Sequence, residues 1–186
     1  MPDFPELRLR RLRKNEAIRS LVRETTLDSG DFIYPLFIVE GKGIKKDIET
    51  MPGIYHFSAD KLGGEIDDLV RLKIPAVLLF GVVSGKDELG SGGYRPGGVV
   101  QQAIRAIKKA APGMLVITDI CLCEYTSHGH CGVIENGDVD NDKTLPLLAK
   151  MALSHAEAGL KVAIIAREQT MPGLLAAMED YFRKEA

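Results

Sequence analysis

The chain has 186 residues, of which 45% are hydrophobic and 27% charged, and its net charge is −2. This length and balance are typical of one globular domain with a sizeable core. The nearly neutral charge excludes the strong positive field with which proteins bind nucleic acid or anionic membranes.

The sequence also gives expectations about location and redox state. No apolar run reaches the roughly 20 residues of a membrane span, and the N-terminus, with Asp3 and Glu6, lacks the apolar core of a signal peptide. We therefore expect a cytoplasmic protein with no membrane or nucleic-acid partner. Its three cysteines, an odd number, favour reduced thiols that bind a metal or act in catalysis over a disulfide framework.

Residues 1–30 are expected to form an N-terminal arm outside the core. Apolar periodicity there is limited to residues 18–22, which suits one short helix. The arm carries a cluster of basic side chains: Arg8, Arg10, Arg11, Arg13, Lys14 and Arg19. In a chain of balanced charge, such a cluster is more typical of a solvated or subunit-contacting surface than of a nucleic-acid site.

Residues 31–186 alternate between strand and helix patterns. The strand candidates are apolar runs rich in aromatic and β-branched residues, at 32–40, 76–83, 114–123 and 162–166. Helices with apolar stripes are expected at 58–72, 99–110, 141–158 and from 172 onward. This alternation predicts an α/β fold with parallel strands and right-handed crossovers.

A glycine-rich segment, GKDELGSGGYRPGG, occupies residues 85–98. It lacks both the Gly-Lys-Ser/Thr ending of a phosphate loop and the three-glycine dinucleotide fingerprint. We expect a mobile loop over a site instead. Lys86 and Tyr34 could reach that site, although their spacing does not require it.

The most unusual stretch is TDICLCEYTSHGHCG, residues 118–132, which holds all three cysteines. Because side chains alternate along a strand, Asp119, Cys121 and Cys123 are expected to share one face. Active sites of α/β barrels lie at the C-terminal ends of their strands. Cys131 follows in a loop flanked by glycines, which can return it to the other two thiols.

Three thiolates leave a fourth coordination position open for water or substrate, as at a catalytic zinc, and sulfur ligands favour zinc over magnesium. The alternative is three buried cysteines that act as small hydrophobic residues, with histidines capping the loop. His128 and His130 could each support a ligand or be exposed loop residues. Adjacency to Cys131 favours His130 for a hydrogen bond behind the ligands.

This stretch is very similar to the zinc motif of the porphobilinogen synthase family, also called delta-aminolevulinic acid dehydratase. Further segments resemble the family in the family's order: RLRRLRKNEAIRSLVRETTL, DFIYPLFIVEG, MPGIYHFS, LLFGV, VQQAIRAIK and NDKTLPLLAKMALSHAEAG. The resemblance covers about residues 6–159. It implies a (βα)₈ TIM barrel, of which this chain would hold about four βα units, a half-barrel preceded by the arm.

The resemblance also implies an activity. Members of the family are zinc-dependent lyases of tetrapyrrole (heme) biosynthesis that condense two 5-aminolevulinate molecules to porphobilinogen, with loss of two waters. Cys121, Cys123 and Cys131 would bind the catalytic Zn²⁺, which acts as a Lewis acid. Asp119 would lie in the substrate pocket, where it positions an amino group or moves a proton. The resemblance further implies self-association through the arm, usually into an octamer, and Mg²⁺ at a second, non-catalytic site of the full-length family.

Residues 160–186 are expected to diverge from the family, so that both substrate-binding lysines, including the one that forms the Schiff base, would lie outside this chain. Lys161 matches no family lysine. A frameshift, a truncated gene and a divergent half-barrel all remain open. The competing hypotheses are a truncated synthase, a non-catalytic zinc-binding or assembly module, and a half-barrel enzyme that uses Lys161. A half-barrel would expose its edge strands, so we expect it to self-associate or to be poorly stable.

Overall fold

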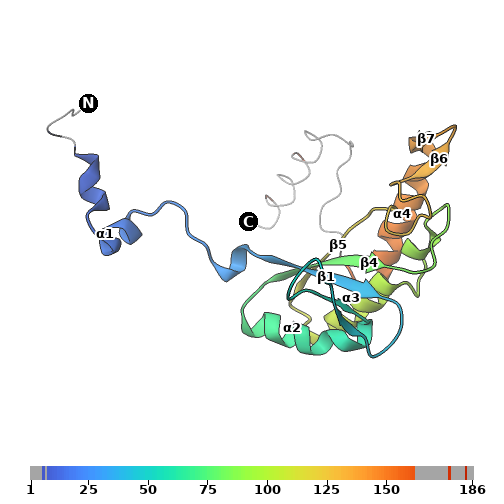
Figure 1. Ribbon diagram of the computed structural model, residues 1–186, viewed down its shortest axis with the longest axis horizontal. Coiled ribbons are helices and arrows are strands. Elements are labelled where there is room, and N and C mark those ends of the chain that lie inside the picture. The colour runs from blue at the N-terminus through green and yellow to red at the C-terminus, as the bar shows by residue number, and fades with distance from the viewer. Residues whose placement is uncertain (1–5, 7, 162–175, 177–182, 184–186) are drawn as a thin grey trace.

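The computed structural model describes residues 6, 8–161, 176 and 183 (Figure 1). Its helices are α1 (Glu16–Leu21), α2 (Leu62–Arg71), α3 (Val99–Ala110) and α4 (Asn141–Glu157). Its strands are β1 (Ile33–Val39), β2 (Lys45–Asp47), β3 (Tyr55–Phe57), β4 (Ala76–Val82), β5 (Leu115–Thr118), β6 (Val133–Glu135) and β7 (Asp138–Asp140). None of the helices in this part of the chain is long and apolar enough to cross a membrane.

A five-stranded sheet forms the centre of the molecule, in the order β2-β3-β1-β4-β5. Strands β3, β1, β4 and β5 run parallel, and β2 pairs antiparallel with β3. The predicted α/β fold with a parallel sheet is therefore confirmed. Within the described residues the sheet remains open, with β2 and β5 at its edges, and no barrel is closed.

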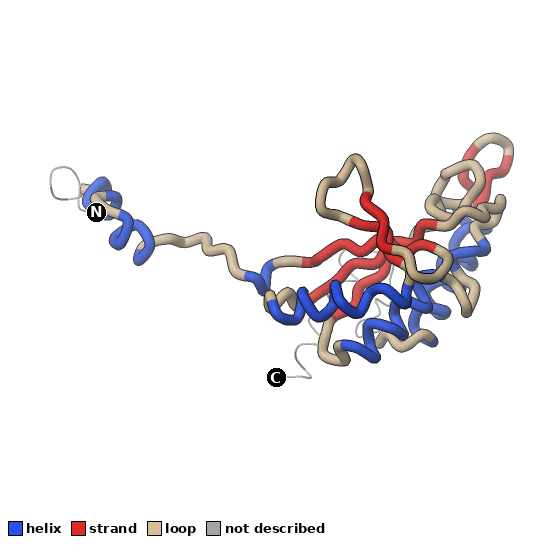
Figure 2. Tube along the Cα trace, turned by 60° about the horizontal axis from the view of Figure 1, so that its bottom comes forward, coloured by secondary structure: helices blue, strands red, loops and turns tan. Residues whose placement is uncertain are grey.

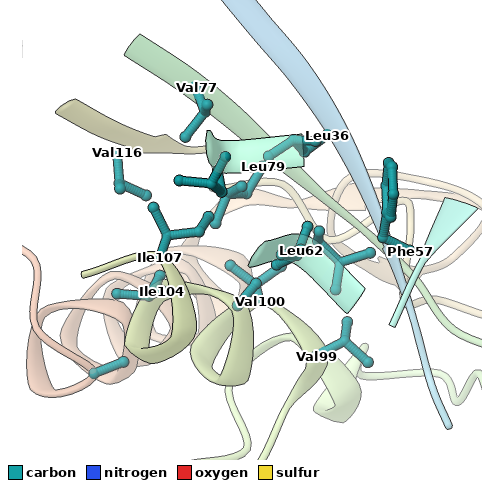
Figure 3. Close-up of a cluster of buried hydrophobic side chains, with 14 of the residues drawn as sticks. Leu36, Phe57, Leu62, Val77, Leu79, Val99, Val100, Ile104, Ile107 and Val116 are labelled. Carbon is teal, nitrogen blue, oxygen red and sulfur yellow. The ribbon is translucent and has the colours of Figure 1, made fainter. Parts of the chain in front are cut away.

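One face of the sheet is covered by helices. Alternate side chains of β1 and β4, among them Leu36 and Leu79, point toward α3, where Ile104 and Ile107 are fully buried (Figure 3). Figure 2 shows the helices along this one side of the sheet. Fully burying an aliphatic side chain contributes about 1.5–3 kcal/mol, so the buried residues of this layer stabilise the fold.

The opposite face of the sheet is apolar but only partly covered. Phe37 of β1 stacks on Phe80 of β4 with ring centroids 5.4 Å apart. At the start of β1 Ile33 is 54% exposed, and at the start of β5 Leu115 is 58% exposed. Parallel sheets are normally buried on both faces, so this face is an apolar surface that the described part of the chain leaves open.

The N-terminal arm lies apart from this sheet (Figure 1). Its helix α1 begins at Asn15, whose side chain accepts a hydrogen bond from the main-chain N–H of Ile18. No residue of α1 is buried, and Leu21 is 85% exposed. The short helix is present as predicted, and it contributes nothing to the core of this chain.

The predicted strand at 114–123 is wrong in its second half, because β5 ends at Thr118. Its last pairing with β4 is Leu79 with Thr118. The chain then turns so that the side chain of Leu122 enters the core with 0% exposure. The carbonyl of Leu122 accepts hydrogen bonds from the N–H groups of Tyr125 and Thr126 at 2.8 and 2.9 Å, which closes the turn.

The start of one helix also differs from the expected one. Helix α4 begins at the expected residue, and Asp140 caps it by accepting a hydrogen bond from the N–H of Lys143. The helix expected from residue 58 begins at Leu62 instead: the hydroxyl oxygen of Ser58 accepts from the N–H of Ile44, and a 3₁₀ turn precedes α2. The expected strand at 162–166 and the helix from 172 lie outside the described residues.

We expect His155, at the end of α4, to make the stability of the protein depend on pH. Its ring is 1% exposed, Nδ1 lies 3.1 Å from the hydroxyl oxygen of Thr118, and Nε2 has no hydrogen-bond partner among the described residues. Burial lowers the pKa of His155 from 6.5 to about 4. The unfolded chain therefore takes up a proton first as the pH falls, so this contribution to stability is complete above pH 6.5 and is lost progressively toward pH 4.

Relative to pH 7.5, the free energy of unfolding should fall by about 2 kcal/mol at pH 5 and by about 3 kcal/mol below pH 4. Urea unfolding at pH 7.5 and pH 5 measures this change in the free energy of unfolding. We expect His155→Leu to reduce the change, whereas the control variant His56→Leu, on β3, should retain it. Equal slopes in the wild-type protein and in His155→Leu would contradict this role of His155.

Candidate metal centre

The three cysteine thiols meet just beyond the C-terminal end of β5. The Sγ atom of Cys121 lies 3.2 Å from that of Cys123 and 3.3 Å from that of Cys131. All three Sγ atoms lie within 4.8 Å of one another, and all three cysteines are free. The structure therefore brings together the three residues that the sequence singled out, although Cys121 and Cys123 lie in a turn and not on a strand.

The packing of Leu122 explains why the thiols of Cys121 and Cys123 lie together. Leu122 is fully buried, whereas its neighbours Cys121 and Cys123 are half-buried. The side chain between the two cysteines thus points into the core and the cysteines point the other way. Cys131, which is exposed, comes to them from the far end of the loop.

This donor set fits a tetrahedral metal ion. Zinc binds thiolate sulfur at about 2.3 Å, so two thiolates of a tetrahedral site are about 3.8 Å apart. The observed separations of 3.2 and 3.3 Å are slightly shorter, and small outward rotations of the side chains would open them. Three sulfur ligands also leave a fourth position for a water or a substrate oxygen.

The contacts between the thiols favour the protonated forms of Cys123 and Cys131. The contact with Cys121, together with burial, raises the pKa of Cys123 to about 12, and the contact with Cys121 also raises the pKa of Cys131. A divalent cation must displace these protons when it binds.

Two carboxylate residues, Asp119 and Glu124, flank Cys121 and Cys123 in the sequence. Asp119, half-buried, directly follows β5, and a carboxylate oxygen of Glu124 accepts a hydrogen bond of 3.2 Å from the N–H of Gly81 at the end of β4. Burial and the negative charge of Asp119 raise the pKa of Glu124 to about 7, against the smaller opposing effects of the Gly81 hydrogen bond and the charge of Lys86. The sequence alone does not distinguish Glu124 as a site residue. The one signal that could have identified it is its position within the motif of residues 118–132.

Tyr125 anchors in the core the segment that carries Cys121 and Cys123. Its ring is 2% exposed and lies against three glycines. A Cβ atom on Gly81 would collide with the Tyr125 hydroxyl, and one on Gly92 or Gly93 would lie 3.0–3.3 Å from the ring. Gly92 and Gly93 belong to the segment expected to be a mobile loop. They are buried in a 3₁₀ turn, Ser91–Gly93, so this part of the glycine-rich segment is packed against Tyr125.

The two histidines of the motif lie together, with ring centroids 5.6 Å apart. His128 Nδ1 accepts a hydrogen bond from the N–H of His130, so Nε2 is the protonated nitrogen and donates to the carbonyl of Glu88 at 3.2 Å. His130 is exposed, and its main-chain carbonyl accepts from the hydroxyl of Thr126. Both histidines thus help to fold the loop that leads to Cys131.

Two other residues considered from the sequence lie elsewhere. The hydroxyl of Tyr34 donates to a carboxylate oxygen of Glu65 on α2 at 2.9 Å, and burial with this contact raises the pKa of Tyr34 to about 12. Tyr34 therefore faces the helix layer and not the thiols. Lys161 is exposed after the end of α4.

Comparison with known proteins identifies the family. The family model described as delta-aminolevulinic acid dehydratase matches residues 6–186. The chain belongs to this family. The match extends beyond residue 159, the limit of the segments that carry the resemblance in the sequence.

Curated relatives with the same name include proteins of Ruminiclostridium josui and Halalkalibacterium halodurans. The first is 53% identical over 177 residues, which cover 95% of this chain and 85% of the relative. The second is 50% identical over 176 residues, which cover 95% of this chain and 53% of the relative. The chain thus spans about half the length of most of the curated relatives described, such as the 46% identical protein of Bacillus subtilis, of which it covers 54%.

A similar solved structure is the delta-aminolevulinic acid dehydratase (porphobilinogen synthase) of Toxoplasma gondii in complex with the reaction product porphobilinogen. It is 33% identical with a TM-score of 0.79, and the match covers 96% of this chain and 51% of that one. The arrangement of the described sheet and helices is therefore that of a porphobilinogen synthase.

We expect Gly93→Ala to lower the free energy of unfolding by about 1–3 kcal/mol, as overpacking of a core does. The added methyl group would meet the Tyr125 ring and the end of the Met151 side chain. Gly97→Ala is the matched control in the same segment, because nothing lies within 4 Å of its added Cβ. Urea unfolding of both variants measures the difference, and equal stabilities would show that the contact between Gly93 and Tyr125 is not tight.

Proposed function

We propose that this chain forms the metal-binding part of a porphobilinogen synthase, which condenses two 5-aminolevulinate molecules to porphobilinogen with loss of two waters. The observation that carries the proposal is the meeting of Cys121, Cys123 and Cys131 at the C-terminal end of β5 in a member of this family. The bound product of the Toxoplasma gondii enzyme supports the choice of reaction.

Each residue near the thiols has a proposed role. Cys121, Cys123 and Cys131 hold Zn²⁺, for which their soft donor set is suited. The bound metal supplies Lewis-acid polarisation of a substrate oxygen. Asp119, next to the thiols, binds the amino group of a substrate or moves a proton. His130 supports the ligand that follows it by helping to order the loop.

The wider architecture follows from the same proposal. Residues 31–186 would form about four βα units of a (βα)₈ barrel, and residues 1–30 a separate arm. The open edges of the sheet and its uncovered apolar face support a partial barrel that needs a further layer. In this proposal the protein acts in the cytoplasm in tetrapyrrole biosynthesis, and a second Mg²⁺ site belongs to the complete family architecture.

Metal binding and turnover can be measured separately. We expect the purified, reduced chain to bind one Zn²⁺ and Cys123→Ser to bind it at least about tenfold more weakly, because one of three ligands loses its thiolate. Porphobilinogen should form from 5-aminolevulinate when the chain is mixed with the part of the Halalkalibacterium halodurans protein that follows the matched region. The full-length relative is the positive control, and Cys123→Ser in the mixture is the negative one.

The outcomes distinguish the candidate functions. A chain that binds no Zn²⁺ would refute the proposal. Zinc binding without product in the mixture would identify a metal-binding or assembly module. Product from the chain alone would require a Schiff-base lysine within it, and borohydride trapping with substrate would show whether Lys161 forms the imine.

The arm provides a prediction about assembly. In the proposal it binds a second copy of the chain through side chains that are exposed here, including Leu21 at 85% and Leu27 at 77%. We expect the wild-type protein to sediment as a dimer or larger at micromolar concentration and the double variant Leu21→Glu, Leu27→Glu to form smaller species. Leu153→Glu, at a 61% exposed position on α4, is the control. A monomeric wild-type protein would rule out assembly through the arm.

A further inference from the structure

The loop that carries Cys131 back to the other thiols is bound to the glycine-rich segment by its main chain. The N–H of Asp87 donates to the carbonyl of Tyr125 at 3.2 Å, and the N–H of Ser127 donates to the carbonyl of Asp87 at 2.9 Å. Asp87 and Thr126 thus form an isolated parallel bridge. One residue of the glycine-rich segment holds the loop on both sides of Thr126.

The side chain of Asp87 fixes the conformation of its own segment. Oδ1 accepts hydrogen bonds from the N–H groups of Leu89 and Ser91 at 2.9 and 3.0 Å, and Oδ2 accepts from the hydroxyl of Ser91. These bonds, led by that of the Ser91 hydroxyl, lower the pKa of Asp87. The carboxylate is therefore engaged within its segment, which makes it unsuited as a ligand for the nearby thiol site.

Further contacts extend this attachment toward Cys131. His128 Nε2 donates to the carbonyl of Glu88, and the hydroxyl of Thr126 donates to the carbonyl of His130 at 2.8 Å. At the other end, Tyr125 packs against Gly92 and Gly93 of the same segment. Residues 125–128 are thus attached to residues 87–93, and the hydrogen bond from Thr126 to His130 orders the loop between them and Cys131.

We propose that Asp87 is a positioning residue for the three-thiol site, which it serves by holding residues 125–128 in the conformation that brings Cys131 to Cys121. The inference rests on the proposed function in that it takes the thiols to bind a metal. A free loop between two ligands must lose conformational entropy when the metal binds, whereas an ordered loop has already lost it. Partners behind metal ligands typically change metal affinity by about 10–100-fold.

Three variants test this role in the full chain. Asp87→Ala removes the acceptors of the Leu89 and Ser91 hydrogen bonds, whereas Asp87→Asn keeps an oxygen for the two N–H groups. Asp60→Ala is the matched control. The Asp60 carboxylate also accepts a main-chain hydrogen bond, from the N–H of Gly43, but Gly43 lies in the loop between β1 and β2 and not in the loop that carries Cys131. Co²⁺ binding, followed by its thiolate charge-transfer absorption, and Zn²⁺ affinity, by chelator competition, provide the readouts under reducing conditions.

We expect Asp87→Ala to bind both metals at least about tenfold more weakly, and Asp87→Asn and Asp60→Ala to remain within about threefold of the wild-type protein. Wild-type affinity in Asp87→Ala would overturn the inference. Failure of the wild-type protein to bind either metal would refute the proposed function instead, so the two failures are distinguishable.

Circular dichroism shows whether Asp87→Ala is folded. If it is not, Ser91→Ala decides, because it removes only the hydroxyl that contacts the Asp87 carboxylate. Weakened Co²⁺ binding by a folded Ser91→Ala variant would support the positioning role, and affinity within about twofold of the wild-type protein would overturn it.

Discussion

Burial of Leu122 is the contact on which the thiol arrangement depends. Because this side chain must enter the core, Cys121 and Cys123 on either side of it are directed away from the core and toward each other. The same residue ends the extended chain, since its carbonyl accepts the two hydrogen bonds that close the turn after β5. One apolar side chain thereby joins the packing of the sheet to the geometry of the candidate metal centre.

The parallel sheet determines where this centre can form. Its strands end at a common edge, so Gly81 near the end of β4 meets Glu124 after β5, and the glycine-rich segment that follows β4 meets the loop that follows β5. Segments 40 residues apart in sequence are brought together in this way, as in the contact between His128 and Glu88. The described helices cover one face of the sheet, and α4 contacts the chain just after Cys131, where the hydroxyl oxygen of Thr144 accepts a hydrogen bond from the N–H of Val133.

The parts of this arrangement that could be predicted are those with a local signal. Long apolar runs gave β1 and β4, an amphipathic pattern gave α3, and the density of cysteines gave the candidate site. The strand pattern failed after Thr118, because the sequence Cys-Leu-Cys alternates in polarity in a turn just as it would on a strand. The roles of Glu124, Tyr125 and Asp87 could not be predicted, since each depends on a partner distant in sequence, and three-residue strands such as β6 carry too little pattern to recognise.

The two parts of the site respond differently to protons. The pKa values of Cys123 and Cys131 are raised, so metal binding at these thiols would compete with their protonation. The attachment of the loop consists mainly of main-chain hydrogen bonds, which do not titrate, and of the Asp87 carboxylate, whose pKa is lowered. With a metal held by the thiols as proposed, moderate acidification would weaken its binding while the loop stays in place. Such a site could lose its metal and bind it again without having to refold the segment that carries Cys131.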